Sequence, residues 1–250
     1  MRISFLILLL MCFCTQSNVF AQKDITTFGI QYKPIVPNRL IGTYDQKFDS
    51  DPFYSTVQQT LGHSFGMVIR RGFTNTLSIE TGINYTQRNF KVNYDVPDSG
   101  FSGNSTVGLV AYEIPIQGLV YIQLSDALFL NASFGFSLNY FASDVQVKEY
   151  IRLSENFQFE GARRSLFQVA ALVNVGFEYR TKNMGYFYLG SSYNLPVSDF
   201  YTFAVSYEYQ GGNDLSIDNI RGSYLTIDLR YFFHEEKETN AQRKQRKRKK

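Results

Sequence analysis

The chain has 250 residues, no Trp, 18 Tyr and 23 Phe, and a formal net charge of +3. This length allows one large domain or two small ones. The aromatic content is high for a soluble domain, yet beyond the N-terminal segment no apolar run reaches the roughly 20 residues of a membrane helix, which excludes a helical membrane protein.

The N-terminal segment has the layout of a secretory signal peptide over residues 1–21. Arg2 gives a short positive start, Ile3 to Phe13 form the apolar core, and Val19-Phe20-Ala21 gives a cleavage site before Gln22. The alternative, an uncleaved anchor, is disfavoured because the core is short for a membrane span. Both cysteines, Cys12 and Cys14, lie in this segment, so we expect an exported mature chain without disulfides.

From the N-terminal segment onward, apolar and polar residues alternate with a period of two, which is typical of strands with two unlike faces. The clearest segments begin at Leu77, Leu128, Phe167 and Leu225, and in each the apolar residues share one face. Weaker segments lie at about 27–33, 60–71, 109–123 and 186–195. The pattern therefore predicts eight strands.

The connections between these segments alternate in length. Short turns lie at 72–75, 124–127 and 181–185, and long polar stretches lie at about 34–59, 91–107, 142–165 and 196–222. This asymmetry is typical of bacterial outer-membrane barrels, which have short periplasmic turns and long external loops. We therefore predict an all-β fold: an eight-stranded antiparallel transmembrane β-barrel with up-and-down order over residues 22–234, with both ends periplasmic.

A soluble eight-stranded barrel of lipocalin type, which would bind a ligand inside, is the structural alternative. Its strands also alternate, but its apolar residues face inward. The polar faces here are rich in Gly, Ser and Asn, which suit a narrow lumen better than a solvated surface, so the membrane barrel is favoured.

Charged residues on the polar faces must lie inside such a barrel, because eight strands leave a lumen just wide enough for side chains to fill. Buried charges require partners. We therefore predict a structural charge network in the lumen, and a gate or proton path is the alternative. Its predicted members are Arg70, Glu80, Glu113, Glu178, Arg180, Asp228 and Arg230.

Candidate catalytic and metal-binding residues are scarce. His63 and His234 are the two histidines, no serine stands in a hydrolase motif, and the mature chain has no cysteine. We expect no enzymatic activity, no cofactor and no metal site.

The last sixteen residues, 235–250, differ sharply from the rest, because they end in a basic run. Without this tail and the signal peptide, 16 basic and 19 acidic residues remain. Such a run is predicted to be a disordered periplasmic tail. A periplasmic location argues against nucleic acid as partner and leaves anionic lipid, cell-wall polymer or an acidic periplasmic protein as the available polyanions. A solubilising tail without a partner is the favoured interpretation. The basic residues of the tail are Arg243, Lys244, Arg246, Lys247, Arg248, Lys249 and Lys250.

With the strands placed, residues 27–233 resemble the outer-membrane β-barrel proteins of Bacteroidota, the group often labelled PorT-like. The resemblance rests on the segments 77–85 and 112–121, on the Ala21-Gln22 junction and on the final Tyr231-Phe232-Phe233. It implies an irregular pairing at the strand proline, Pro115. A tail after the last strand departs from the family pattern.

These observations lead to the prediction of a non-enzymatic outer-membrane barrel with a filled polar lumen, acting as an anchoring, structural or interaction protein. Its partners would be outer-membrane lipid and an envelope protein bound through the loops or the tail. The alternative is a narrow transport or secretion-accessory barrel, as the PorT-like resemblance implies.

Overall fold

A computed structural model describes residues 25–37, 45–51, 53–74, 76–152, 155–209, 211–220 and 222–234. The predicted signal peptide (1–21) and basic tail (235–250) lie outside these residues. Among the described residues, no helix is long and apolar enough to cross a membrane.

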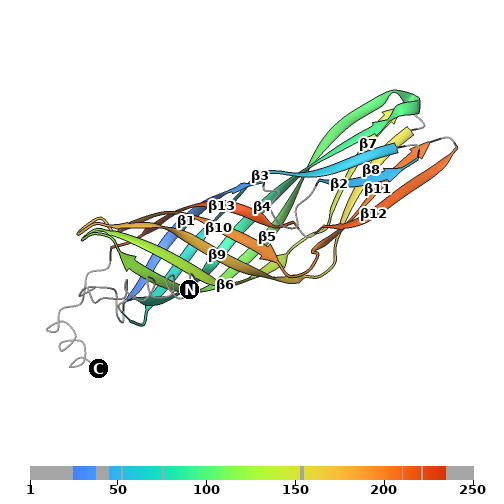
Figure 1. Cartoon of the computed structure of the whole chain (residues 1–250). Coiled ribbons are helices and arrows are strands. Elements are labelled where there is room, and N and C mark those ends of the chain that lie inside the picture. Colours follow the sequence, from blue (N-terminus) through green and yellow to red (C-terminus); the bar gives the residue numbers. More distant parts are fainter. Residues whose placement is uncertain are drawn as a thin grey trace, which may run out of the picture.

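Eight antiparallel strands form a closed ring (Figure 1). Each strand pairs with the next one along the ring, and β1 pairs with both β3 and β13, which closes the sheet. The prediction of an eight-stranded up-and-down barrel is therefore confirmed. The strands are β1 (Thr26–Val36), β3 (Phe53–Gly72), β4 (Leu77–Val96), β5 (Phe101–Gln123), β6 (Leu128–Phe141), β9 (Phe167–Arg180), β10 (Tyr186–Pro196) and β13 (Tyr224–Phe232).

The polarity of this barrel is inside-out. On β4, Leu77 and Ile83 point outward and are 47% and 45% exposed, whereas Glu80 and Asn84 point inward and are 2% and 0% exposed. The strands that begin at Leu128 and Phe167 show the same division. This arrangement is the reverse of a lipocalin and suits an apolar solvent, so the lipocalin alternative is excluded.

Three tight turns lie at one end of the barrel and match the predicted ones. Backbone bonds close them from Phe73 N to Leu77 O (3.0 Å), from Leu124 N to Leu128 O (2.9 Å) and from Thr181 N to Gly185 O (3.1 Å). The start of β1 and the end of β13 lie at the same end, since Gly72 N donates to Ile25 O and Phe233 N to Phe28 O.

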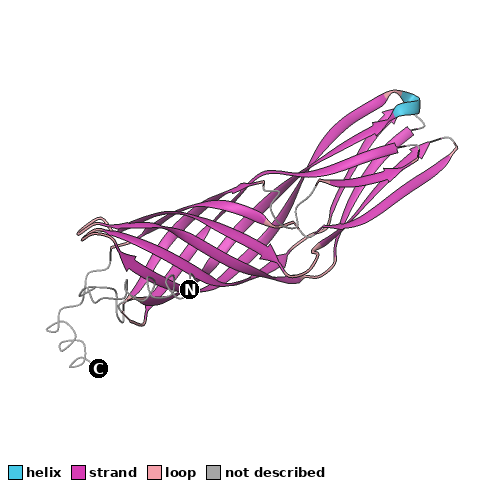
Figure 2. Cartoon of the chain, in the orientation of Figure 1, coloured by secondary structure: helices cyan, strands magenta, loops and turns pink. Residues whose placement is uncertain are grey.

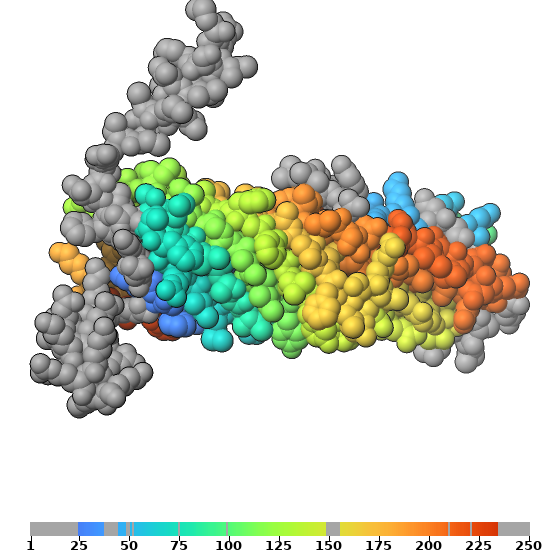
Figure 3. All heavy atoms as spheres, turned by 90° about the horizontal axis from the view of Figure 1, so that it is seen from below, coloured from blue at the N-terminus to red at the C-terminus, as the bar shows by residue number. Residues whose placement is uncertain are grey.

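The long connections at the opposite end contain strands in their described parts, in contrast to the polar loops expected there. β3, β4 and β5 continue beyond the barrel, and a short 3-10 helix, η1 (Pro97–Ser99), caps the β4–β5 hairpin (Figure 2). Five further strands join them: β2 (Gln46–Ser50), β7 (Val145–Arg152), β8 (Glu155–Arg163), β11 (Tyr201–Tyr209) and β12 (Gly212–Ile220). We call this part the external module; in space-filling view it prolongs the barrel into one continuous rod (Figure 3).

The external module has an apolar interior of its own, unlike the barrel. Phe157 stacks on Tyr94 with ring centroids 4.2 Å apart, and Phe203 meets Phe159 edge to face at 4.7 Å. These rings come from two sheets, one made of β2 and the upper parts of β3 to β5, the other of β12, β11, β8 and β7. The module is therefore a packed structure and not a set of independent loops.

A register shift in β3 joins the two parts. Between Thr60 and His63 the pairing with β4 slips, and the buried residues change from Phe53, Ser55 and Val57 to Ser64, Val68 and Arg70. Because side chains alternate along a strand, a slip of one residue exchanges its faces. The same strand thus lines an apolar core above and a polar lumen below.

Irregular pairing was also expected at Pro115. The β4–β5 ladder is interrupted there, between the pairs Thr81–Ile116 and Asn84–Glu113, and its register is unchanged. A proline cannot donate to the ladder, which explains the gap without a bulge.

Candidate functional site: the charged lumen

Arginines and carboxylates from four strands meet in the lumen near the tight-turn end. Arg70 on β3 contacts Glu80 on β4, with Nε–Oε2 and Nη2–Oε2 distances of 3.1 and 2.9 Å, and also donates to Glu178 on β9. The pair with Glu80 joins two neighbouring strands, and the pair with Glu178 joins two strands on opposite sides of the ring. A single guanidinium makes both contacts. Its five donors in one plane suit it to this bridging role.

The network continues on both sides of Arg70. Arg180 Nε donates to Glu178 Oε1 at 2.6 Å, and Arg230 donates to Glu80 and, at 2.7 Å, to Asp228 Oδ2. Six of the seven predicted lumen charges thus lie in one continuous chain of ion pairs.

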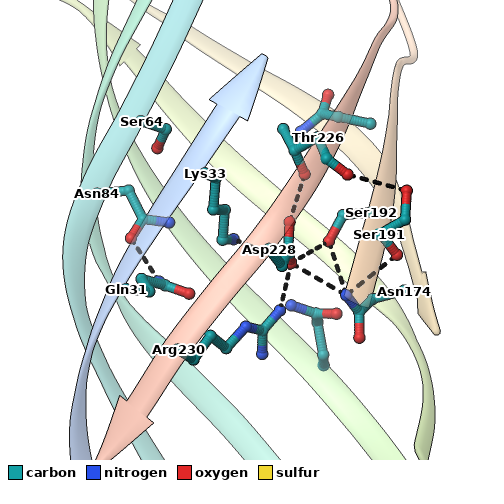
Figure 4. Close-up of polar contacts among 12 residues, drawn as sticks. Gln31, Lys33, Ser64, Asn84, Asn174, Ser191, Ser192, Thr226, Asp228 and Arg230 are labelled. Atoms are coloured by element: carbon teal, nitrogen blue, oxygen red, sulfur yellow. Dashed lines mark hydrogen bonds and ion pairs between the residues drawn. The ribbon is translucent and has the colours of Figure 1, made fainter. Parts of the chain in front are cut away.

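Asp228 has the most partners among these carboxylates (Figure 4). It accepts hydrogen bonds from Ser192 Oγ at 2.6 Å, Thr226 Oγ1 at 2.5 Å and Asn174 Nδ2 at 3.0 Å. Lys33 Nζ lies 4.0 Å away. A buried carboxylate needs this number of donors to offset the loss of water.

Aromatic rings lie against the guanidinium groups of the network. Arg70 is 4.0 Å from the Phe232 ring centroid, and Arg180 is 3.8 Å from that of Phe129. Such cation–π contacts add attraction where donors are few.

Glu113 is the one predicted lumen charge outside the network. It is buried on β5 and accepts a hydrogen bond from Tyr224 Oη at 3.1 Å. The sequence prediction also omitted two buried members, Lys33 and Asn174. Lys33 lies two residues after Gln31 on the inner face of β1, so the alternation along this strand was a sequence signal that could have placed Lys33 in the lumen.

The upper lumen is filled as well. Two internal cavities of the described upper lumen have volumes of about 10 Å³ each, one lined by Lys33, Ser64 and Glu113 and the other by Thr86, Arg88 and Gln168. Each has room for about one water molecule, so these cavities do not form a channel.

Chemistry beyond charge pairing is sparse in the described part of the chain. His63 lies on the outer surface at the β3 bulge, with its ring 6.4 Å from Tyr85. Within the described ranges, no group of three or more His, Cys, Asp or Glu side chains is placed to hold a metal ion. The predicted basic residues of the tail, Arg243 to Lys250, fall outside these ranges.

The external module exposes apolar side chains on one of its strands. Its inner aromatic residues are fully buried, while β12 exposes Leu215 (54%) and Ile217 (59%) on the outer face.

Burial, together with the negative charge of Asp144, raises the pKa of Tyr201 to about 12 and keeps its hydroxyl protonated as a donor to Ser143 O.

No protein-family model matches this chain, and no curated protein sequence matches it. Among solved structures, the chain is similar to the outer membrane protein OprG from Pseudomonas aeruginosa, with a TM-score of 0.53 and 12% identity. The match covers 86% of this chain and 98% of the OprG chain. At this identity the likeness shows the fold alone, and that fold is the outer-membrane β-barrel.

Proposed function

We propose that this chain is a non-enzymatic outer-membrane protein whose filled barrel anchors the external module at the cell surface. The observation that carries the proposal is the lumen, where Arg70, Glu80, Glu178 and Arg230 are paired and at most 4% exposed. A barrel with a filled interior serves as a membrane anchor more readily than as a route for solutes.

The exposed apolar belt supports a location in lipid. Phe134, Met67 and Leu189 are 68%, 60% and 56% exposed on the outer barrel surface. A band of this kind is unfavourable in water and favourable in hydrocarbon. Outer-membrane lipid is therefore the proposed partner of the barrel, after export directed by residues 1–21.

The proposed orientation follows from the asymmetry of the two ends. The tight turns, both ends of the barrel sheet and the basic tail would be periplasmic, and the external module would face the medium. An envelope or extracellular protein would then bind the external module, or the tail on the other side. Nucleic acid is not among the proposed partners.

Planar-bilayer recording of the purified full-length mature protein tests the proposal. We expect no steady current, because the lumen is filled. The alternative of a narrow transport or secretion-accessory barrel, carried by the PorT-like resemblance, predicts a steady current that changes in Glu80→Gln or Arg230→Met. Such a current would refute the anchoring function.

A further inference from the structure

An open hollow of about 390 Å³ lies on the external module, close to η1 at its tip (Figure 2). This volume falls within the roughly 300–1,000 Å³ of small-ligand sites. Tyr94 and Gly103 line the hollow where β4 and β5 pair. The other lining residues come from β3, β4 and β5, and every one of their side chains has a hydrogen-bonding group. They are Tyr54, Thr56, Asn93, Asp95, Ser102 and Asn104.

The strand register places these six side chains in two rows on the outer face of the sheet. The first row runs from Tyr54 through Asp95 to Ser102, and the second row holds the other three. Neighbouring strands are about 4.8 Å apart, and every second residue of a strand is about 7 Å from the last. The two rows therefore cover an area of about 10 by 7 Å, which suits one or two sugar rings.

The sheet beneath the hollow is firmly packed. Tyr94 and Gly103 are paired between the two rows, and the Tyr94 ring is 4% exposed and stacks on Phe157 at 4.2 Å. An added Cβ at Gly103 would lie 2.5 Å from Tyr94 Oη, so the ring fills the inner side of the sheet there. Because β4 is paired on both sides at this point, an occupant cannot add a strand and must bind through side chains.

The fold makes no use of the six polar side chains. Within the described chain, no hydrogen bond or ion pair engages them, and the Tyr54 ring is 51% exposed without an aromatic neighbour. The outer face of the opposite sheet differs, because its polar side chains bond to one another. Gln146 donates to Glu160 at 2.7 Å, and Thr202 donates to Asn219 at 2.7 Å. Exposure alone therefore does not explain the free groups of the hollow.

An exposed ring among amides, hydroxyls and a carboxylate matches the chemistry of a carbohydrate. A sugar ring has an apolar C–H face that packs on an aromatic ring, and each of its hydroxyls both donates and accepts. The amides of Asn93 and Asn104 offer donors and acceptors, and Asp95 offers two acceptor oxygens. No Lys or Arg lines the hollow, although Lys47 lies opposite Thr56 at its edge. A neutral sugar fits this lining better than an acidic one.

We propose that the hollow binds neutral hexose units of a glycan. Tyr54 packs against the C–H face of the sugar, while Asn93, Asn104 and Asp95 bond to its hydroxyls. Asp95 is the single carboxylate of the lining, so the proposed contacts include no metal ion. The proposal goes beyond the anchoring function and does not rest on it, because binding is a property of the purified protein.

Saturation-transfer NMR tests the proposal with the methyl glycosides of glucose, galactose and mannose. The full mature protein would be held in lauryldimethylamine oxide, since maltoside and glucoside detergents carry competing sugars. At millimolar glycoside we expect transfer to at least one of the three, strongest at the ring C–H protons that face Tyr54. Transfer to none of them would overturn the proposal.

Variants then locate the bound sugar. Tyr54→Ala should raise the dissociation constant about tenfold, and Tyr54→Phe, which keeps the ring, should leave it nearly unchanged. Asn104→Ala should also weaken binding, whereas Asn213→Ala, at an exposed position of β12, is the matched control and should not. The heat-modifiable gel band checks that each variant is folded. Equal affinity in wild type, Tyr54→Ala and Asn104→Ala would place the sugar elsewhere and refute the site, and Asn104→Ala decides the matter if Tyr54→Ala does not fold.

Discussion

Arg70 shows how a single side chain holds opposite walls of the barrel together. It is fully buried, pairs with Glu80 and Glu178, and stacks on Phe232. A buried ion pair offers little net stability over an apolar replacement, but removal of one partner leaves a charge without compensation. The lumen is therefore sensitive to single substitutions and tolerant of matched ones.

Arg70→Met should lower the free energy of unfolding by about 3 kcal/mol, near the lower end for a broken buried pair. The expected loss lies near the lower end of that range because Glu80 still forms an ion pair with Arg230 and Glu178 with Arg180. Urea unfolding of the protein in lipid vesicles measures the change, with Arg71→Met as the exposed control. Adding Glu80→Gln to Arg70→Met should restore part of the loss, because Arg230 keeps Asp228 and Arg180 keeps Glu178; a further additive loss would contradict this account.

Gly222 illustrates a residue constrained both by its backbone and by its surroundings. Its φ is 57°, and an added Cβ would lie 2.1 Å from Arg88 Nη2 and 2.9 Å from Phe200 Cε1. Gly100 provides a matched control, because its φ is 63° and nothing lies within 4 Å of an added Cβ.

Gly100→Ala should therefore cost only the left-handed strain, about 1 kcal/mol, whereas Gly222→Ala should cost about 3 kcal/mol or more. The melting temperatures of the two variants in the same detergent measure the difference. Equal shifts would contradict this prediction, because they would mean that Arg88 and Phe200 move away from the added Cβ without loss of stability.

At the scale of strands, the external module depends on its aromatic core. Phe203 is 0% exposed and contacts Phe159 and Phe90 at centroid distances of 4.7 and 5.9 Å. Phe203→Ala should destabilise the module by about 3–5 kcal/mol. We expect new protease cleavage in β7–β8 and β11–β12 while the barrel keeps its heat-modifiable band on a detergent gel.

Ile217→Ala, on the exposed face of β12, is the control for this experiment and should leave cleavage unchanged. Loss of the folded barrel band in Phe203→Ala would show that barrel and module unfold as one unit, against the prediction.

The strands of the barrel were predictable because each has one predominantly apolar face. From Leu225 to Phe233, the inward and outward residues in the structure are those that the alternation assigns. The external strands carry the same signal, for example in Phe203, Val205 and Tyr207, which alternate with Thr202, Ala204, Ser206 and Glu208. Their high content of Asn, Asp, Ser and Gly obscured it and favoured loops.

The side-chain ion pairs within the lumen were harder to predict from the sequence. Arg70 and Glu80 lie opposite each other on adjacent strands, so a hairpin register predicts their contact. The contact between Arg70 and Glu178 joins residues 108 positions apart across the ring. It depends on the stagger of all eight strands, which alternation along single strands does not specify.

At the scale of the whole molecule, the two ends of the rod carry different chemistry. One end has three tight turns with exposed polar residues such as Asp126, and the other has the packed external module with η1 at its tip. A chain inserted in a membrane in one direction must expose these ends to different compartments. This asymmetry makes the proposed orientation testable in cells.

Single cysteines report the orientation, because Cys12 and Cys14 are the two cysteines of the sequence and belong to the predicted signal peptide. Asp98→Cys, exposed in η1, should react with a membrane-impermeant maleimide on intact cells. Asp126→Cys, exposed in the β5–β6 turn, should react only after the outer membrane is permeabilised. The reverse labelling pattern would show that the barrel has the opposite orientation. The external module would then lie in the periplasm, where it could not meet an extracellular partner.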